Sequence, residues 1–262
     1  MNFQKKIVIF GTMIAIITAL TACGNKSTDA LTRVKENGTL TVVGSGGYPP
    51  FNYMEEDQVV GFDVDVGKEI AKRLGVKLDY VTSDWDGLVE GLRNKRYDAI
   101  LGSMAITDKR SEVVDFTDPY YYSGAQLFVR KDSNITKADE MADKKIAVAT
   151  GTNFVQDAEA LNADVSYYQD DNATLLELIN GRVDGVITDR LVALSAMKKL
   201  SGGDDLMMAD HLLRLEKMGI AFNKDDQTLL NRINEILKEM REDGTLKEIS
   251  VKWLDGVDIT VE

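Results

Sequence analysis

Two similar segments of the chain place charged side chains directly after short apolar runs. Residues 96–110 read RYDAILGSMAITDKR, and residues 182–190 read RVDGVITDR. An apolar run of this length predicts a buried strand. The first segment then presents Arg110, whose guanidinium suits a carboxylate, and the second presents Asp189, whose carboxylate suits an ammonium. A ligand that carries both groups on neighbouring atoms is an α-amino acid.

The alternative for both residues is an ordinary structural role. Most arginines lie at the solvated surface, and an exposed ion pair stabilises a fold only slightly. The positions of Arg110 and Asp189 after strands favour binding, because ligands of open α/β sheets bind beyond the carboxyl ends of strands. Either Asp108 or Thr107 is placed to cap the helical turn that carries Arg110.

Strands and amphipathic helices alternate along the chain, which predicts an α/β fold built from βαβ units. The predicted strands cover residues 40–44, 76–81, 99–101, 146–149 and 183–187. Val66, Ile70 and Leu74 repeat every fourth residue, which predicts a helix that ends at Gly75. A second apolar stripe at residues 229–240 predicts another helix.

The glycine-rich loop after the first predicted strand is not a phosphate-binding motif. Residues 44–51 read GSGGYPPF, which lacks the spacing of dinucleotide or nucleotide triphosphate loops. We expect a loop that lets the backbone approach a ligand beneath Tyr48; the alternative for Tyr48 is core packing. Asp63, Asp65 and Gly67 lack the spacing of a calcium loop, so we expect no metal and no cofactor.

The amino-terminal segment has the pattern of a secretory signal. Lys5 and Lys6 precede an apolar run at residues 7–20 that is too short to span a membrane as a helix. Residues 20–23, Leu-Thr-Ala-Cys, resemble the lipobox of bacterial lipoproteins. That resemblance implies a signal peptide over residues 1–22 and a lipidated, palmitate-bearing Cys23, and we expect a tether over residues 23–36. A structural thiol is the alternative for Cys23.

Charge and composition narrow the class of protein. The net charge is −12, and removal of Lys5 and Lys6 with the signal would change it by −2, to −14. Such an acidic chain is unsuited to nucleic acid. Cys23 and His211 are the single cysteine and histidine, so no disulfide framework and no nucleophile–base pair is expected. We therefore expect a binding protein and not an enzyme.

Four segments in order resemble one family: GFDVDVGKEIAKRLG, SDWDGLVEGL, RYDAILGSMAITDKRSEVVDFTDPYYYSG and GRVDGVITD. They are similar to the family 3 extracellular solute-binding proteins, the receptors of polar amino acid ABC importers. The resemblance implies a two-lobed α/β periplasmic binding protein of type II, with two hinge strands near residues 122–129 and 218–222. Lobe 1 would comprise residues 37–122 and 221–258, and lobe 2 residues 123–220.

The resemblance also assigns roles to individual residues. Arg110 matches the family's carboxylate-binding arginine, and Asp189 matches its ammonium-binding aspartate. Tyr48 and Trp85 match two aromatic residues that enclose the ligand side chain. The remaining matches are to main-chain and hydroxyl contacts with the ligand, at Ser103, Ala105, Thr152 and Asn153. Ala105 stands where many members have serine or threonine, so one hydroxyl is lost.

A second departure concerns specificity. Ser45 stands where members that select basic amino acids often carry aspartate, which favours a neutral ligand such as cystine or glutamine. The resemblance implies a monomer, anchored to the membrane by lipid, that delivers a free amino acid to the permease of an ABC transporter. Two alternatives stay open: a cyclohexadienyl dehydratase-like enzyme on the same fold, and a ligand sensor that acts through a separate partner.

Overall fold

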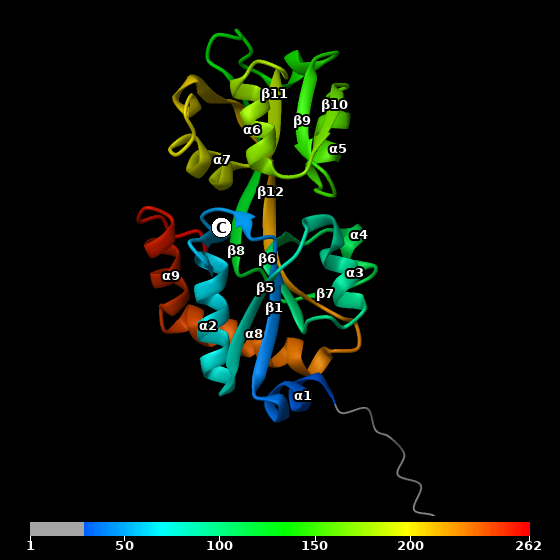
Figure 1. The fold of residues 1–262 in the computed structure, drawn as a ribbon, viewed down its shortest axis with the longest axis vertical. Coiled ribbons are helices and arrows are strands. Elements are labelled where there is room, and N and C mark those ends of the chain that lie inside the picture. The colour runs from blue at the N-terminus through cyan, green and yellow to red at the C-terminus, as the bar shows by residue number, and fades with distance from the viewer. Residues whose placement is uncertain (1–28) are drawn as a thin grey trace, which may run out of the picture.

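The computed structural model describes residues 29–262, so the expected signal peptide and Cys23 lie outside the described residues. Within this range no helix is both long enough and apolar enough to cross a membrane. Figure 1 shows two masses stacked along the long axis, joined by the long strands β8 (Tyr121–Arg130) and β12 (Leu206–Phe222).

One nine-stranded sheet runs through both lobes, in the order β10-β9-β11-β8-β12-β6-β1-β5, with β7 (Asp115–Phe116) paired to β12. β12 pairs antiparallel with β8 from Leu206 to Met218, and the register shifts between Ala209 and Arg214. The predicted second hinge at residues 218–222 is therefore only the last part of a 17-residue strand. The mixed α/β fold itself is as predicted.

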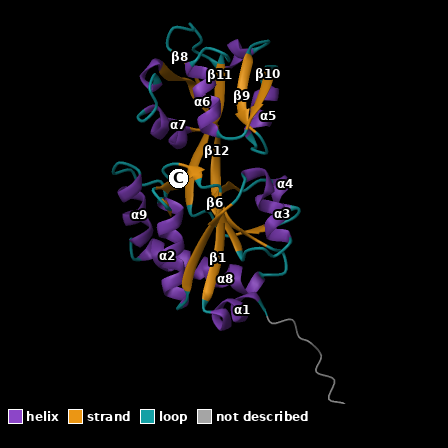
Figure 2. Ribbon diagram, viewed as in Figure 1, coloured by secondary structure: helices purple, strands orange, loops and turns teal. Residues whose placement is uncertain are grey.

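The first lobe contains three parallel strands with helices on both faces (Figure 2). The strands are β1 (Thr39–Gly44), β5 (Lys77–Thr82) and β6 (Ala99–Ala105). The helices are α2 (Phe62–Leu74), α3 (Leu88–Arg93), α4 (Asp108–Ser111), α8 (Gln227–Glu242) and α9 (Thr245–Trp253). Every residue of β6 is buried, which explains why Ser103 is the only polar side chain in AILGSMA.

The second lobe repeats this plan on a smaller scale. Its strands are β9 (Lys145–Ala149), β10 (Asp164–Tyr168) and β11 (Gly185–Asp189). Its helices are α5 (Phe154–Ala160), α6 (Asp171–Ile179) and α7 (Arg190–Met197). β11 pairs antiparallel with β8, which attaches this lobe to the hinge.

A small antiparallel sheet that the sequence did not predict covers one edge of the first lobe. It consists of β2 (Gly47–Tyr48), β3 (Asn52–Glu55) and β4 (Gln58–Val60). Beneath it lies an aromatic core in which Phe51 stacks on Tyr121, with ring centroids 4.8 Å apart. This core supports the loop that carries Tyr48.

The expected tether over residues 23–36 is wrong for its second half. Residues Ala30–Asn37 form helix α1, capped by the Asp29 side chain, which accepts a hydrogen bond from the Thr32 backbone N–H at 3.2 Å. Val34 is buried, and Thr228 of α8 donates to Asp29 at 2.8 Å. The Asp29 cap and a following Gly38 were signals of a helix that the polar composition obscured.

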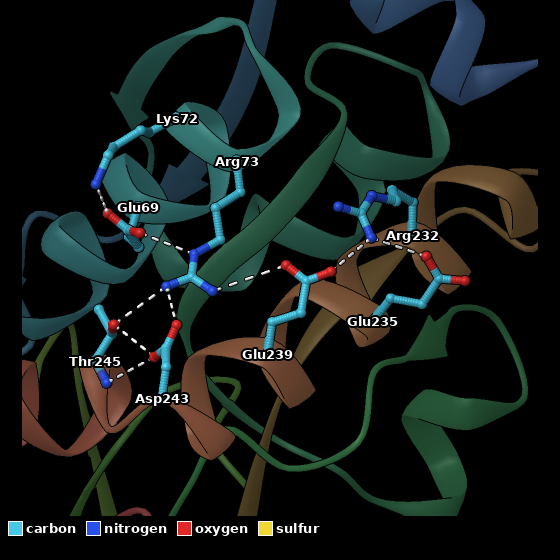
Figure 3. A network of polar contacts seen from close by, with 8 residues as sticks. All are labelled: Glu69, Lys72, Arg73, Arg232, Glu235, Glu239, Asp243 and Thr245. Atoms are coloured by element: carbon cyan, nitrogen blue, oxygen red, sulfur yellow. Dashed lines mark hydrogen bonds and ion pairs between the residues drawn. The ribbon is translucent and has the colours of Figure 1, made fainter.

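A polar network joins α2 to α8 and α9 at the surface (Figure 3). Arg73 bonds Glu69 on its own helix at 2.8 Å, Asp243 at 2.8 Å and Thr245 at 3.1 Å. Glu239 lies 3.8 Å from the same guanidinium. Arg73 is therefore one polar link that reaches three helices of the first lobe.

Candidate functional site

A cavity of about 430 Å³ lies where the two lobes face each other. Seven of the eight predicted binding residues line it: Tyr48, Trp85, Ser103, Ala105, Arg110, Thr152 and Asn153. The exception is Asp189. The other charged or amide side chains that line it are Asp84, Asp86, Gln169, Asp170, Asp171 and Glu216.

The lobes touch at one edge of this cavity. Gly151 of the second lobe, at φ +76°, lies against Trp85 and Asp86 of the first. A Cβ atom at Gly151 would meet the Asp86 Cβ at 3.3 Å, which is tighter than most real contacts. A glycine here therefore provides both the left-handed backbone and the close approach of the lobes.

Arg110 is held in place by the strand end that precedes it. Thr107 caps α4 by accepting from the Arg110 backbone N–H at 3.2 Å, and the guanidinium donates to the Ala105 carbonyl at 2.9 Å. Its Cζ lies 5.4 Å from the centre of the Trp85 ring. Within residues 29–262, no carboxylate lies at ion-pair distance from Arg110, and burial lowers the pKa of its side chain.

The two predicted aromatic residues come from separate elements. Tyr48 ends β2 and lies 5.9 Å from Phe51 between ring centres, at a tilt of 33°. Trp85 begins a 3-10 turn over Trp85–Gly87, ahead of α3. Both are partly buried and line the cavity, so they offer apolar surface on its first-lobe side.

Ser103 has a conformation that serine rarely adopts. It lies within β6 with φ of +58°, in the left-handed region. Its backbone N–H donates to the Tyr120 hydroxyl at 3.1 Å, and its own hydroxyl donates to Asp63 at 2.9 Å. The strand end that leads to Arg110 is therefore fixed by buried side-chain contacts.

In the second lobe, Thr152 and Asn153 do not cap α5. The Thr152 hydroxyl donates to the Ala149 carbonyl at 2.7 Å and closes the preceding turn. The Asn153 side chain makes no cap hydrogen bond; its amide donates instead to Glu216 on β12. The loop is thus tied to the hinge strand.

Asp189 is buried and lies outside the lining of the cavity. One oxygen caps α7 by accepting from the N–H groups of Leu191 at 2.8 Å and Val192 at 3.2 Å. Its Oδ2 has no hydrogen-bond partner among residues 29–262, although the Ser123 hydroxyl is near. Burial raises the Asp189 pKa to about 7. Its role toward a ligand stays a prediction.

Two buried carboxylates of the cavity lining were missed by sequence reasoning, Glu216 and Asp171. Glu216 is 2% exposed on the hinge strand, bonds Arg214 at 2.8 Å, and leaves Oε2 without a partner among the described residues. Asp171 is buried beside Thr188, which donates to it, and burial raises its pKa to about 6. Asp171 follows the end of β10, so the strand-end rule was the signal available for it.

The cavity lining contains neither histidine nor cysteine among residues 29–262. His211 is exposed and does not line the cavity. Among residues 29–262 no cluster of three or more histidine, cysteine, aspartate or glutamate side chains is placed to hold a metal. What the cavity does offer is an arginine without a carboxylate partner, aromatic walls and several carboxylates.

A two-lobed fold with a polar cavity between the lobes defines a solute-binding protein. The chain belongs to the bacterial extracellular solute-binding proteins, family 3, whose family model matches residues 40–256. It is 34% identical over 252 residues to the L-cystine-binding protein TcyJ of Escherichia coli K12, covering 94% of each chain.

Solved structures agree with this membership. An ancestral arginine-binding protein bound to arginine superposes with a TM-score of 0.77 at 36% identity, covering 82% of this chain and 98% of that chain. The ancestral amino acid-binding protein AncCDT-1, a precursor of cyclohexadienyl dehydratase, gives a TM-score of 0.79 at 33% identity, with 86% and 99% covered. Relatives of this chain are thus amino-acid-binding proteins.

Proposed function

We propose that this protein captures a free polar amino acid, such as cystine or glutamine, and presents it to the permease of an ABC importer. Arg110 holds the ligand's α-carboxylate and Asp189 its α-ammonium. Tyr48 and Trp85 enclose the side chain. The lobes divide within β8 and β12, near residues 122–123 and 220–221, and close around the ligand.

One observation carries the assignment of an α-carboxylate. Arg110 lines the cavity, is aligned by Ala105 and Trp85, and has no carboxylate partner among residues 29–262. A guanidinium removed from water favours an anionic partner with two acceptor oxygens. A ligand carboxylate meets that need, and the acidic second-lobe wall suits the ligand's ammonium.

The side-chain specificity follows from the charges of the residues that line the cavity. Ser45 supplies no charge there, which supports a neutral amino acid. However, Asp84, Asp86 and Asp170 also line the cavity, and these exposed carboxylates suit a ligand with a distal cation. Arginine is therefore the informative competitor of cystine and glutamine.

We place the protein outside the cytoplasm, anchored by acyl chains on Cys23. One acyl modification with two chains is enough for stable attachment, while residues 29–262 stay in water as a monomer. Palmitate labelling of the wild-type chain and of Cys23→Ala tests this anchor, and loss of the label in the variant is the expected result.

A thermal-shift screen tests the ligand class. Purified protein is heated with L-cystine, L-glutamine, L-arginine, L-glutamate or arogenate. A ligand at a hundredfold its dissociation constant stabilises by about 2.7 kcal/mol. The Arg110→Gln variant should lose the shift, whereas Arg93→Gln, an exposed arginine of α3, should keep it. A wild-type protein that responds to no amino acid contradicts the proposal.

A second candidate is an elimination enzyme, because a structural neighbour is described as a precursor of cyclohexadienyl dehydratase. That neighbour is itself an amino acid-binding protein, and none of the described residues that line the cavity is a histidine or a cysteine. Incubation with arogenate separates the two functions. Formation of phenylalanine at a rate above that of an Arg110→Gln control would establish catalysis.

A further inference from the structure

A buried carboxylate that takes no part in lining the cavity lies in the first turn of α2. Asp63 is fully buried and accepts three hydrogen bonds. Its Oδ2 accepts from the Asn52 amide at 2.8 Å and the Ser103 hydroxyl at 2.9 Å, and its Oδ1 accepts from the Tyr120 hydroxyl at 2.7 Å. All three donors are neutral.

The first donor connects Asp63 to the loop before Tyr48. Because the Asn52 amide nitrogen donates to Asp63, its oxygen is turned toward the loop. That oxygen accepts from the Gly46 backbone N–H at 3.0 Å and the Ser45 hydroxyl at 3.3 Å. The Asn52 side chain thus connects Asp63 directly to Ser45, which lines the cavity.

The other two donors fix the end of β6. The Tyr120 hydroxyl donates its proton to Asp63, so it meets the Ser103 backbone N–H as an acceptor, at 3.1 Å. The Ser103 hydroxyl is bonded to the same carboxylate. A serine at φ +58° is unfavourable unless its surroundings hold it there, and both of its restraints end at Asp63.

We propose that Asp63 is a positioning residue for ligand binding, which holds the Ser45–Tyr48 loop and Ser103 in binding geometry without touching the ligand. The inference rests on the proposed function. An ionised carboxylate accepts from all three donors without presenting a hydrogen of its own. An amide or a protonated acid at this position turns a hydrogen toward one of the three donors and weakens the hold on that segment.

The proposal predicts a dependence on pH. Burial raises the Asp63 pKa to about 6. The tyrosines that face it are Tyr48, Tyr80, Tyr120 and Tyr121, whose pKa values burial raises further above their ordinary range, so they stay neutral. Across the cavity, Asp171 and Asp189 titrate in a similar range, with pKa values of about 6 and 7. The contribution of Asp63 is therefore measured as the ratio of the dissociation constants of Asp63→Asn and the wild-type protein at each pH.

The test compares Asp63→Asn with Asp65→Asn, two residues further along the same helix. Asp65 is partly buried, bonds Lys68, Lys252 and Trp253, and has no contact with the network. Dissociation constants for the amino acid found in the screen are measured by calorimetry near pH 8 and pH 5. We expect Asp63→Asn to weaken binding at least tenfold near pH 8, and Asp65→Asn to change it less than twofold.

Near pH 5 the ratio of Asp63→Asn to wild type should shrink to about threefold or less, because the wild-type carboxyl is then protonated. A folded Asp63→Asn protein with wild-type affinity near pH 8 overturns the proposal, as does a ratio that is the same at both pH values. A merely structural residue would lower the melting temperature without this convergence.

Tyr120→Phe keeps the proposal testable if Asp63→Asn does not fold. This change removes one hydroxyl, keeps the ring in the aromatic core, and alters no residue that lines the cavity. It should weaken binding about tenfold near pH 8, and unchanged affinity would contradict the inference. If the wild-type protein binds no amino acid, the proposed function fails as well, whereas wild-type binding with unaffected variants refutes this inference alone.

Discussion

Replacing Asp189 by asparagine should stabilise the unliganded protein while it weakens the ligand complex. The Asp189 carboxylate is fully buried and one oxygen has no partner among the described residues. Asparagine is an equally good helix cap, so the hydrogen bonds from Leu191 and Val192 are kept. The variant therefore removes a buried charge and little else.

The size of the gain follows from the pKa. The folded-state pKa of Asp189 is about 7 and its ordinary value is 3.8. Between these values the folded protein binds a proton that the unfolded chain does not, so stability falls as the pH rises through this window. At 1.36 kcal/mol for each unit, the variant gains about 2 kcal/mol near pH 5 and about 4 kcal/mol near pH 8.

Urea unfolding of both proteins at the two pH values measures this difference. Asp29→Asn is the matched control, because Asp29 also caps a helix but its pKa is lowered to about 2 by hydrogen bonds from Thr32 and Thr228. Its ionised form stabilises the fold above its ordinary pKa, so the control should lose stability at neutral pH. An Asp189→Asn protein that is less stable near pH 8, or a difference that does not change with pH, refutes the reasoning.

The same variant should bind its ligand more weakly. Loss of a charge-assisted hydrogen bond to the α-ammonium costs about 1.5–3 kcal/mol, which is roughly a 10- to 150-fold increase in the dissociation constant. Calorimetry near pH 8 measures this increase. Unchanged affinity would show that the ammonium is held elsewhere, for example by Asp171 or Glu216.

Three further variants test the contacts between elements. Asn153→Asp sets a carboxylate against buried Glu216 and should cost about 2–4 kcal/mol of stability near pH 8, with recovery in acid. The control Asn94→Asp, beside exposed Glu90, should change the free energy of unfolding in urea by only a few tenths of a kcal/mol. Gly151→Val should weaken ligand binding about tenfold, because the new side chain would collide with Asp86 where the lobes meet. The control Gly38→Ala changes a glycine that also has a left-handed backbone but no atom nearby, so it should alter stability alone. Equal effects of the two variants on affinity would contradict this prediction. Arg73→Ala should cost about 1–2 kcal/mol of stability (Figure 3), and Arg232→Ala, which bonds only within α8, much less, with no change in ligand affinity for either.

The sequence predicted correctly those elements whose signal lies within a few neighbouring residues, such as an apolar stripe or a helix cap. The apolar stripe of α8 lies in the core, with Leu229, Ile233 and Ile236 buried as expected. Of the two cap candidates for α4, Thr107 is the residue that caps it, and Arg110 lines the cavity. In each case one helical turn or one strand end contains the whole signal.

Long-range pairing decided the features that the sequence did not predict. The first half of β12 reads LMMADHLL, in which polar residues interrupt the apolar run. Its residues Leu206–Ala209 pair with β8 ahead of the register shift. Glu216 is another case, since a glutamate on a strand is usually solvated. It is buried because Arg214 and Asn153, one from the hinge and one from the second lobe, both bond it.

The buried carboxylates connect these observations into one physical argument. Asp63, Asp171 and Asp189 all have raised pKa values because burial disfavours their charge. In a fold selected for stability alone, neutral side chains would serve better. Their positions around one cavity make physical sense if a bound ammonium offsets the cost of burying charge at Asp171 and Asp189, while Asp63 accepts hydrogen bonds that align the binding loops. The unliganded protein is then less stable than its fold allows. The ligand stabilises the folded protein most at pH values at which these carboxylates are ionised.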